Sequence, residues 1–370
     1  MAEQTSRPTH RDGRTDATEA SERPLAIDAE GLALTYSDGT EAVADLTLAV
    51  PEGECFGLLG ANGAGKTTTI KMLATLLEPT AGSVRVDGHD VTAERTRVRA
   101  SVGYMAQETG VDEELTAREN LAFACDAYGV SRDDRDDRIA ELLELVDLTD
   151  VADTPAVTFS GGMKKRLDAA TALVHDPRLV FLDEPTTGLD PKARDRLWGY
   201  VQRINDRGTT VFLTTQYLEE ADRLCDRIAV VRDGRVVADD SPTALKRRVG
   251  GERLEVAVAG GHDAVESAAA VVRDTTGVGD PASRVTAVEA TDDAVRVTAP
   301  DASELGPDLL FALRDAGLSV TDFSVEEPTL DDVFFAVAAE ATDALDAEAN
   351  EEGDASTAEE APRPPAEVEG

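Results

Sequence analysis

One glycine-rich stretch decides the fold of this chain, and it reads Gly60-Ala61-Asn62-Gly63-Ala64-Gly65-Lys66-Thr67. It fits the phosphate-binding pattern G-x-x-x-x-G-K-[ST] completely. Apolar residues 55–59 before it predict a strand and residues 70–77 after it a helix, which is the context that distinguishes this motif from a chance glycine-rich turn. The glycines let backbone N–H groups surround phosphates, and the start of the helix adds partial positive charge. The stretch therefore predicts a nucleotide site.

Within this loop we assign individual roles. Lys66 is expected to reach the β- and γ-phosphates of ATP, and the Thr67 hydroxyl to ligate Mg²⁺. The following residue, Thr68, is counted with the nucleotide contacts.

A second stretch, residues 179–184, reads Leu-Val-Phe-Leu-Asp-Glu. A buried apolar strand would deliver Asp183 to the magnesium, directly or through water, and Glu184 beside it could polarise the attacking water. On its own, a hydrophobic run that ends in two acids is as often a plain strand end. Combined with the phosphate loop, it predicts a nucleotide hydrolase.

A third stretch, residues 159–163, reads Phe-Ser-Gly-Gly-Met. Ser160 can cap a helix that starts near Gly161, and Gly161 with Gly162 lets backbone N–H groups approach a phosphate closely. Ser-Gly-Gly alone is usually an ordinary helix cap. Here it resembles the signature motif of ABC ATPases, usually written LSGGQ, and it precedes the acidic strand by the spacing of that family.

Further residues match the ABC family in their order along the chain. Gln107 resembles the Q-loop glutamine, which the resemblance places on magnesium and on the partner membrane subunit. Tyr36 matches the aromatic that stacks on adenine, although a lone tyrosine is more often a half-buried strand residue. Asp190, in Thr-Gly-Leu-Asp, resembles the D-loop, which couples two ATP sites.

Position 216 departs from the family pattern, because most relatives carry a histidine where this chain has Gln216. A glutamine amide can donate a hydrogen bond to the γ-phosphate, but it cannot carry a proton near neutral pH. This puts a mechanism that requires a charged histidine in doubt. We place Gln216 with Glu184 and Lys66 as the catalytic set. The substitution, and Glu-Pro-Thr-Leu-Asp-Asp-Val-Phe at 327–334, resemble the daunorubicin-resistance branch of drug-export ATPases.

The alternation of short apolar runs with helical patterns predicts an α/β fold. We expect an ABC ATPase (P-loop NTPase) domain over 25–250, with a helical subdomain over about 108–175. The order β-α-β-β-α-β then predicts a small ferredoxin-like α+β accessory domain over 251–339. A disordered leader is expected at 1–24 and an acidic disordered tail at 340–370.

Charge excludes one class of partner. The chain of 370 residues carries 74 acidic and 36 basic residues, a net charge of −38, which argues against nucleic acid because phosphate backbones need a basic face. The same balance, with aromatics at 4%, suits a halophilic source, since concentrated salt screens self-repulsion. No apolar run is long enough to cross a bilayer, and the N-terminus is not a signal peptide. We expect a chain at the cytoplasmic face of the membrane.

The resemblance implies a function. The chain would hydrolyse ATP to ADP and phosphate as a subunit of an ABC transporter, and power export of a hydrophobic compound through a separate integral-membrane permease. One loop and one signature motif per chain imply a second copy, most simply a homodimer. The alternative is a soluble ABC ATPase that acts as a mechanical switch or regulator. Such relatives typically carry two motor domains or coiled-coil insertions, and neither is present here.

Overall fold

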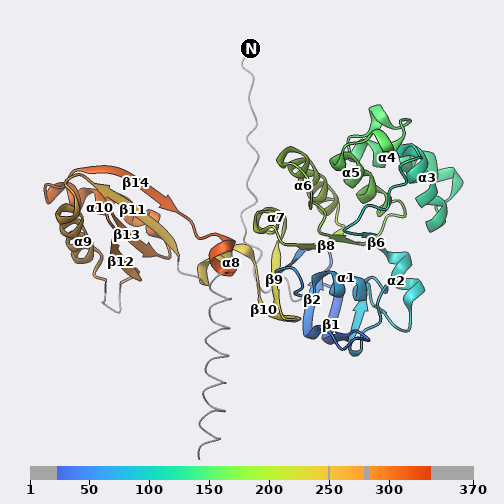
Figure 1. Ribbon diagram of the computed structural model, residues 1–370, viewed down its shortest axis with the longest axis horizontal. Helices are drawn as coiled ribbons and strands as arrows, with labels where there is room; N and C mark the ends of the chain where they lie inside the picture. The colour runs from blue at the N-terminus through green and yellow to red at the C-terminus, as the bar shows by residue number, and fades with distance from the viewer. Residues whose placement is uncertain (1–22, 249–250, 279–282, 335–370) are drawn as a thin grey trace, which may run out of the picture. The chain divides into compact units, whose positions relative to one another are not determined.

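The computed structural model describes residues 23–248, 251–278 and 283–334. The chain divides into two compact units, Met1–Val236 and Val237–Gly370, and each is described by itself (Figure 1). The domain limits expected from the sequence stay predictions. The predicted tail, and the leader except for residues 23 and 24, lie outside the described residues.

The first unit is built on a ten-stranded sheet in the order β5-β4-β1-β2-β10-β9-β3-β8-β7-β6. One half is parallel and contains β3 (Cys55–Leu59), β6 (Val102–Met105), β7 (Leu179–Asp183), β8 (Thr210–Thr215) and β9 (Arg227–Arg232). The other half contains β1 (Leu25–Thr35), β2 (Glu41–Pro51), β4 (Ala81–Val86), β5 (His89–Asp90) and β10 (Arg235–Asp240). Every residue of β3, β7 and β8 is buried, as expected for parallel strands covered on both faces.

Aromatic side chains form the centre of this sheet. The ring centroids of Phe56 and Phe212 lie 5.4 Å apart, and those of Phe181 and Phe212 lie 5.7 Å apart. All three are fully buried, and each buried side chain of this size contributes about 1.5–3 kcal/mol to folding. The packing fixes the neighbouring strands β3, β8 and β7, so their carboxyl ends lie side by side.

The sheet is covered by the helices α1 (Lys66–Leu73), α2 (Arg95–Ser101), α6 (Pro191–Asp206) and α7 (Leu218–Leu224). Helix α8 (Pro242–Arg248) follows β10 and belongs to the second unit. Helix α1 begins at the phosphate loop and ends at Leu73, earlier than the predicted end at residue 77. The helix stops there because Thr75 has a φ of 63°, which does not continue a right-handed helix.

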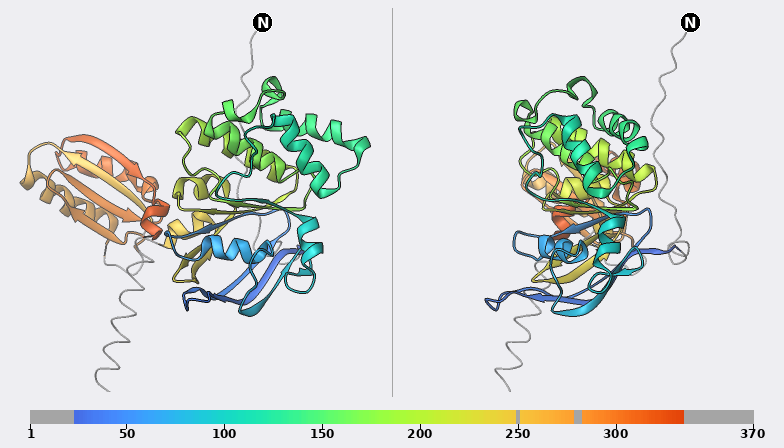
Figure 2. Two further views of the ribbon diagram at one scale, coloured as in Figure 1. Left: turned by 45° about the vertical axis from the view of Figure 1, so that its right-hand side comes forward. Right: turned by 90° about the vertical axis from the view of Figure 1, so that its right-hand side faces the viewer.

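The helical subdomain contains α3 (Ala117–Tyr128), α4 (Arg132–Leu145) and α5 (Gly161–Thr171). Figures 1 and 2 show it on one side of the parallel strands, with α1 on the other side. Within the predicted helical subdomain, α3 ends at Gly129, which has the left-handed φ of 71°. Thr116 and Glu119 form a capping box at the start of α3, and Ser131 caps α4.

The second unit has the predicted β-α-β-β-α-β order. Its elements are β11 (Glu252–Val258), α9 (His262–Thr276), β12 (Ala287–Ala290), β13 (Ala294–Ala299), α10 (Ala302–Asp315) and β14 (Val320–Glu326). The strands form an antiparallel sheet in the order β12-β13-β11-β14. Both helices pack on this sheet (Figure 2), and their buried apolar residues form a separate small core. Of the last helix, predicted for 330–339, the structure describes residues 330–334, which are helical.

Candidate nucleotide site

The phosphate loop joins β3 to α1, and two of its glycines are required by the fold itself. A Cβ atom on Gly60 would lie 2.5 Å from the Val231 carbonyl oxygen, and one on Gly65 would lie 2.4 Å from the Ala42 oxygen. Gly65 also has a φ of 102°, which side chains rarely adopt. The loop therefore curls tightly against its neighbours and presents the start of α1 at the carboxyl edge of the parallel strands.

The Lys66 amine lies inside this loop. Its Nζ donates hydrogen bonds to the Gly60 oxygen at 2.8 Å and the Ala61 oxygen at 3.2 Å. The same Nζ lies 3.5 Å from Glu184 Oε1, and the two side chains are only 4% and 6% exposed. A buried charge needs a partner of opposite sign, and Glu184 provides it. The pair joins the phosphate loop to the end of β7.

Asp183 ends β7 and is fully buried. Its Oδ1 accepts hydrogen bonds from Thr67 Oγ1 at 3.1 Å and from Thr214 Oγ1 at 2.6 Å. Its Oδ2 is buried and has no hydrogen-bond partner in the part of the chain that the structure describes. A carboxylate oxygen without a partner, next to a threonine hydroxyl, fits the oxygen ligands that Mg²⁺ prefers.

Described residues contain no cluster of three or more His, Cys, Asp or Glu that could hold a metal alone. At phosphate sites Mg²⁺ needs no such cluster, because it is bound by one or two protein oxygens together with the phosphates.

Glu184 follows directly, with a φ of 46° in the left-handed region. Such backbone strain in a residue other than glycine is concentrated at functional sites. Its backbone N–H donates to Thr214 Oγ1 at 3.0 Å, while Oε2 accepts from Gln107 Nε2 and from Thr187 Oγ1, both at 3.1 Å. The side chain is thereby held between the phosphate loop and Gln107.

Gln216 and Tyr36 lie at the margins of this cluster. Gln216 is half-buried and follows β8, whose Thr214 pairs with Asp183 of β7, so it comes from the same edge of the sheet. Tyr36 follows β1 and is 40% exposed, more open than a half-buried strand residue. Its hydroxyl lies 3.2 Å from Thr68 Oγ1, which ties the ring to α1. An exposed ring at this place is available for stacking.

The signature segment does not join this cluster. Ser160 caps α5, and its Oγ accepts a hydrogen bond from the Met163 N–H at 3.3 Å. Ser160 and Gly161 are exposed, and a Cβ atom on Gly161 would meet nothing within 4 Å. A Cβ atom on Gly162 would lie 2.8 Å from that of Ala193, so the start of α5 packs against the start of α6.

Asp190 lies at the start of α6, which packs against the start of α5. It caps α6, with Oδ1 accepting from the Ala193 N–H at 3.0 Å, and it is exposed. The predicted site residues therefore form two groups. One is connected by hydrogen bonds around Lys66 and Asp183, and the other is the exposed pair of helix starts at Ser160 and Asp190.

The structure adds contacts that the sequence analysis did not assign. Thr214 holds both Asp183 and Glu184. Lys165 of α5 donates to the Gln107 carbonyl oxygen, and Asp168 accepts from the Gly110 N–H at 3.2 Å. Burial raises the pKa of Asp168 to about 6. The body of α5 is thus fastened to the segment that carries Gln107. The sequence shows the basic residues 164–166, but it does not show that Lys165 binds the Gln107 carbonyl oxygen.

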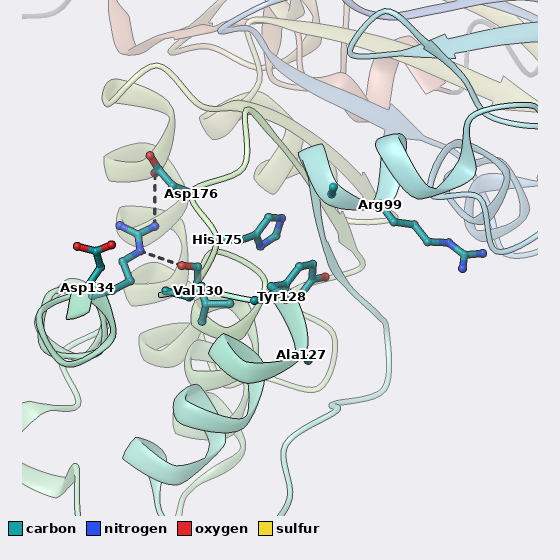
Figure 3. Close-up of a pocket in the computed structure, with 11 residues that line it drawn as sticks. Arg99, Ala127, Tyr128, Val130, Asp134, His175 and Asp176 are labelled. Atoms are coloured by element: carbon teal, nitrogen blue, oxygen red, sulfur yellow. Dashed lines mark hydrogen bonds and ion pairs between the residues drawn. The ribbon is translucent and has the colours of Figure 1, made fainter. Parts of the chain in front are cut away.

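A separate cavity of about 800 Å³ is lined by residues of α2, α3, α4 and the turn before β7 (Figure 3). The Tyr128 and His175 rings stack there, with centroids 3.8 Å apart and planes within 3°. His175 Nε2 lies 3.1 Å from the Val102 oxygen, and burial lowers the pKa of His175. None of the predicted site residues lines this cavity.

A phosphate loop, an acidic strand end and a signature helix on one mixed sheet define an ATP-binding cassette ATPase. Comparisons with known families agree. The family described as "ABC transporter" matches residues 43–187, and "ATP-binding protein DrrA1-3-like, C-terminal domain" matches residues 241–338.

Known relatives resemble nearly the whole chain. The daunorubicin/doxorubicin resistance ATP-binding protein DrrA of Streptomyces peucetius is 44% identical, over 84% of this chain and 92% of its own length. The doxorubicin resistance ATP-binding protein DrrA of Mycobacterium tuberculosis is 36% identical, over 87% and 96%. The chain belongs to the ABC transporter ATP-binding proteins of the daunorubicin-resistance type, and is an ATP-hydrolysing subunit of such a transporter.

Solved structures support the fold of the first unit. An ATP-binding subunit of an ABC transporter matches with a TM-score of 0.55 and 31% identity, over 60% of this chain and 92% of that one. A dimeric post-hydrolysis state of an ATP-binding cassette, bound to ADP and Pi, matches with a TM-score of 0.54 and 27% identity, over 58% and 98%. No helix among the residues described here is long and apolar enough to cross a membrane.

Proposed function

We propose that two copies of this chain bind ATP between them at the cytoplasmic face of the membrane, and that hydrolysis drives an integral-membrane permease which exports a hydrophobic compound. The relatives named for daunorubicin and doxorubicin resistance, and a Nod factor export ATP-binding protein at 42% identity, support the direction of transport. The acidic surface suits a halophilic cell, where salt screens its charge.

The observation that carries the proposal is the hydrogen-bonded cluster at the carboxyl edge of β7. Lys66 bonds the β- and γ-phosphates, while Thr67, Asp183 and Gln107 would hold Mg²⁺. When bound, Mg²⁺ neutralises the charge of the β- and γ-phosphate oxygens.

Glu184 orients the attacking water and accepts its proton. In the structure Glu184 is paired with Lys66, so a γ-phosphate that attracts Lys66 frees the carboxylate for this task. Gln216 donates its amide N–H to the γ-phosphate, which requires no titratable group.

The second copy completes the site. One phosphate loop and one exposed signature helix start per chain leave each nucleotide with half of its contacts, and a twofold axis supplies the other half. The Ser160 hydroxyl, the Gly161 and Gly162 N–H groups and the start of α5 would face the γ-phosphate, with Asp190 at the same interface. The second unit would stabilise or regulate this dimer.

The test combines turnover with recruitment. The purified chain should hydrolyse ATP only with Mg²⁺, and Lys66→Ala should remove this activity. Co-expression with its permease should move the chain to the membrane fraction. Full recruitment to membranes without a permease, or strong binding to ribosomes or DNA instead, would refute the transport function in favour of a mechanical switch.

A further inference from the structure

The buried carboxyl group of Glu220 has no part in the mechanism above. Glu220 lies on α7, four residues after Gln216, and is 0% exposed. Its Oε1 accepts a hydrogen bond from Trp198 Nε1 at 3.0 Å, and its Oε2 is buried without a hydrogen-bond partner within residues 23–248, 251–278 and 283–334. An acidic side chain is rarely buried fully unless it is paired or has a specific task.

Two threonines lie beside this carboxyl group. Thr186 comes two residues after Glu184 and is fully buried, and its hydroxyl has no hydrogen-bond partner among the described residues. Thr215 directly precedes Gln216, and its Oγ1 accepts from the Tyr217 N–H at 2.9 Å. Both hydroxyls are near enough to Glu220 to affect its ionisation. The carboxyl group therefore stands between the segment that carries the general base and the segment that carries Gln216.

The groups around Glu220 act in opposite directions on its pKa. Burial raises its pKa, against the smaller effects of the neighbouring hydroxyls, of Trp198 and of Arg194. Arg194 of α6 lies over the Tyr217 ring at 4.5 Å, and Arg223 lies over Trp198 and pairs with Asp195 at 2.6 Å. A hydroxyl can donate to a carboxylate oxygen or accept from a protonated carboxyl group, so the buried Thr186 hydroxyl can pair with Oε2 while Oε1 accepts from the Trp198 N–H.

We propose that Glu220 is a positioning residue for ATP hydrolysis: anchored on Trp198, it joins Thr186 to Thr215 and so fixes the spacing between Glu184 and Gln216. This rests on the roles of Glu184 and Gln216 in the proposed function. Both act on the same phosphate and water, and a misplacement of about 1 Å at such a site can reduce turnover about 100-fold. ATP binding depends on the phosphate loop and Tyr36, which Glu220 does not contact.

The test compares the effect of each substitution on kcat with its effect on ATP affinity. Glu220→Met, which keeps the volume but removes both polar atoms, should lower kcat about 10- to 100-fold and leave the ATP Kd within about threefold. Glu220→Gln keeps one donor and one acceptor and should restore kcat to within about threefold of wild type. Thr186→Val should lower kcat in the same direction, and its effect should not add to that of Glu220→Met.

Leu224→Ala is the matched control, because it weakens α7 packing without touching either threonine. It should lower Tm while kcat changes less than about twofold. Should Glu220→Met not fold, Thr186→Val alone decides the question, since it acts from another segment. Wild-type kcat in Thr186→Val or Glu220→Met, or equal losses in Leu224→Ala, would overturn the positioning role. Absence of turnover in the unmodified chain would instead refute the proposed function.

Discussion

Two segments of the first unit contain paired glycines, and the two segments need glycine for different reasons. In the phosphate loop, Cβ atoms on Gly60 and Gly65 would collide with backbone oxygens at 2.5 and 2.4 Å, so this chain's own fold requires glycine there. At the start of α5, a Cβ atom on Gly161 would point into open space. The fold of the single chain therefore does not require glycine at 161, and we propose that the glycine leaves room for the phosphate held by a second copy.

The side chains differ in the same way. Around the phosphate loop, Lys66, Asp183 and Glu184 are buried and linked to one another and to their neighbours. At the start of α5, the side chain of Ser160 is exposed and accepts a hydrogen bond from the Met163 N–H of its own helix. The first half of the site can be tested within one chain, and the second half only between two chains.

The largest effect is expected in the buried half. Glu184→Gln removes the base and should lower kcat about 10²- to 10⁴-fold, the usual contribution of a general base. ATP should still bind and hold the dimer together, because the amide keeps the side-chain shape. Single-turnover hydrolysis and light scattering with ATP measure both. Turnover close to wild type would exclude Glu184 as the base.

The next largest effect is a pH-dependent change in stability at Asp168 of α5. The pKa of Asp168 is raised to about 6 from 3.8, so its favourable contribution to folding is complete below pH 3.8 and is lost as the pH rises through 6. Asp168→Asn cannot lose a proton, so its unfolding free energy should gain on wild type by up to about 3 kcal/mol between pH 4 and 6.5. Urea unfolding of both proteins across this range measures the difference. If the difference in unfolding free energy between the two proteins stayed constant with pH, the raised pKa of Asp168 would be contradicted.

A substitution at the open glycine separates the two halves. Gly161→Asp places an acid in the first turn of α5, where it is favourable for a helix, so Tm should not fall. The same charge would repel a phosphate from a second copy, so kcat should drop about 30-fold while ATP affinity of the single chain is unchanged. Gly60→Ala is the opposite control and should lower Tm. Normal turnover in Gly161→Asp would contradict the shared site.

The smallest effect is expected at Gln216. Gln216→Ala removes one hydrogen bond to a charged group, worth about 1.5 kcal/mol, so kcat should fall about tenfold. The ATP Kd should change less than kcat. Steady-state kinetics with nucleotide titration will separate the two, and an unchanged kcat would rule out the role of this amide.

The sequence predicted the buried strands and the loop between β3 and α1 because each signal there is local. Continuous apolar runs mark parallel strands, and fixed glycine spacing marks the loop. The links across the sheet were not predictable in this way. Thr214, Lys165 and Glu220 act on residues far away in the chain, and their spacing carries no pattern of its own. The early end of α1 was likewise missed, because the left-handed Thr75 has no sequence signal comparable to glycine.

The left-handed backbone of Glu184 has a consequence for how such a chain changes over generations. A residue other than glycine in this conformation costs about 1–3 kcal/mol. Glycine at this position would relieve the strain, but it would also leave the buried Lys66 amine without its counter-charge, which costs about 3–5 kcal/mol. Selection for folding and selection for activity therefore favour the same carboxylate, and a library of random variants screened only for heat resistance should retain an acidic residue at position 184.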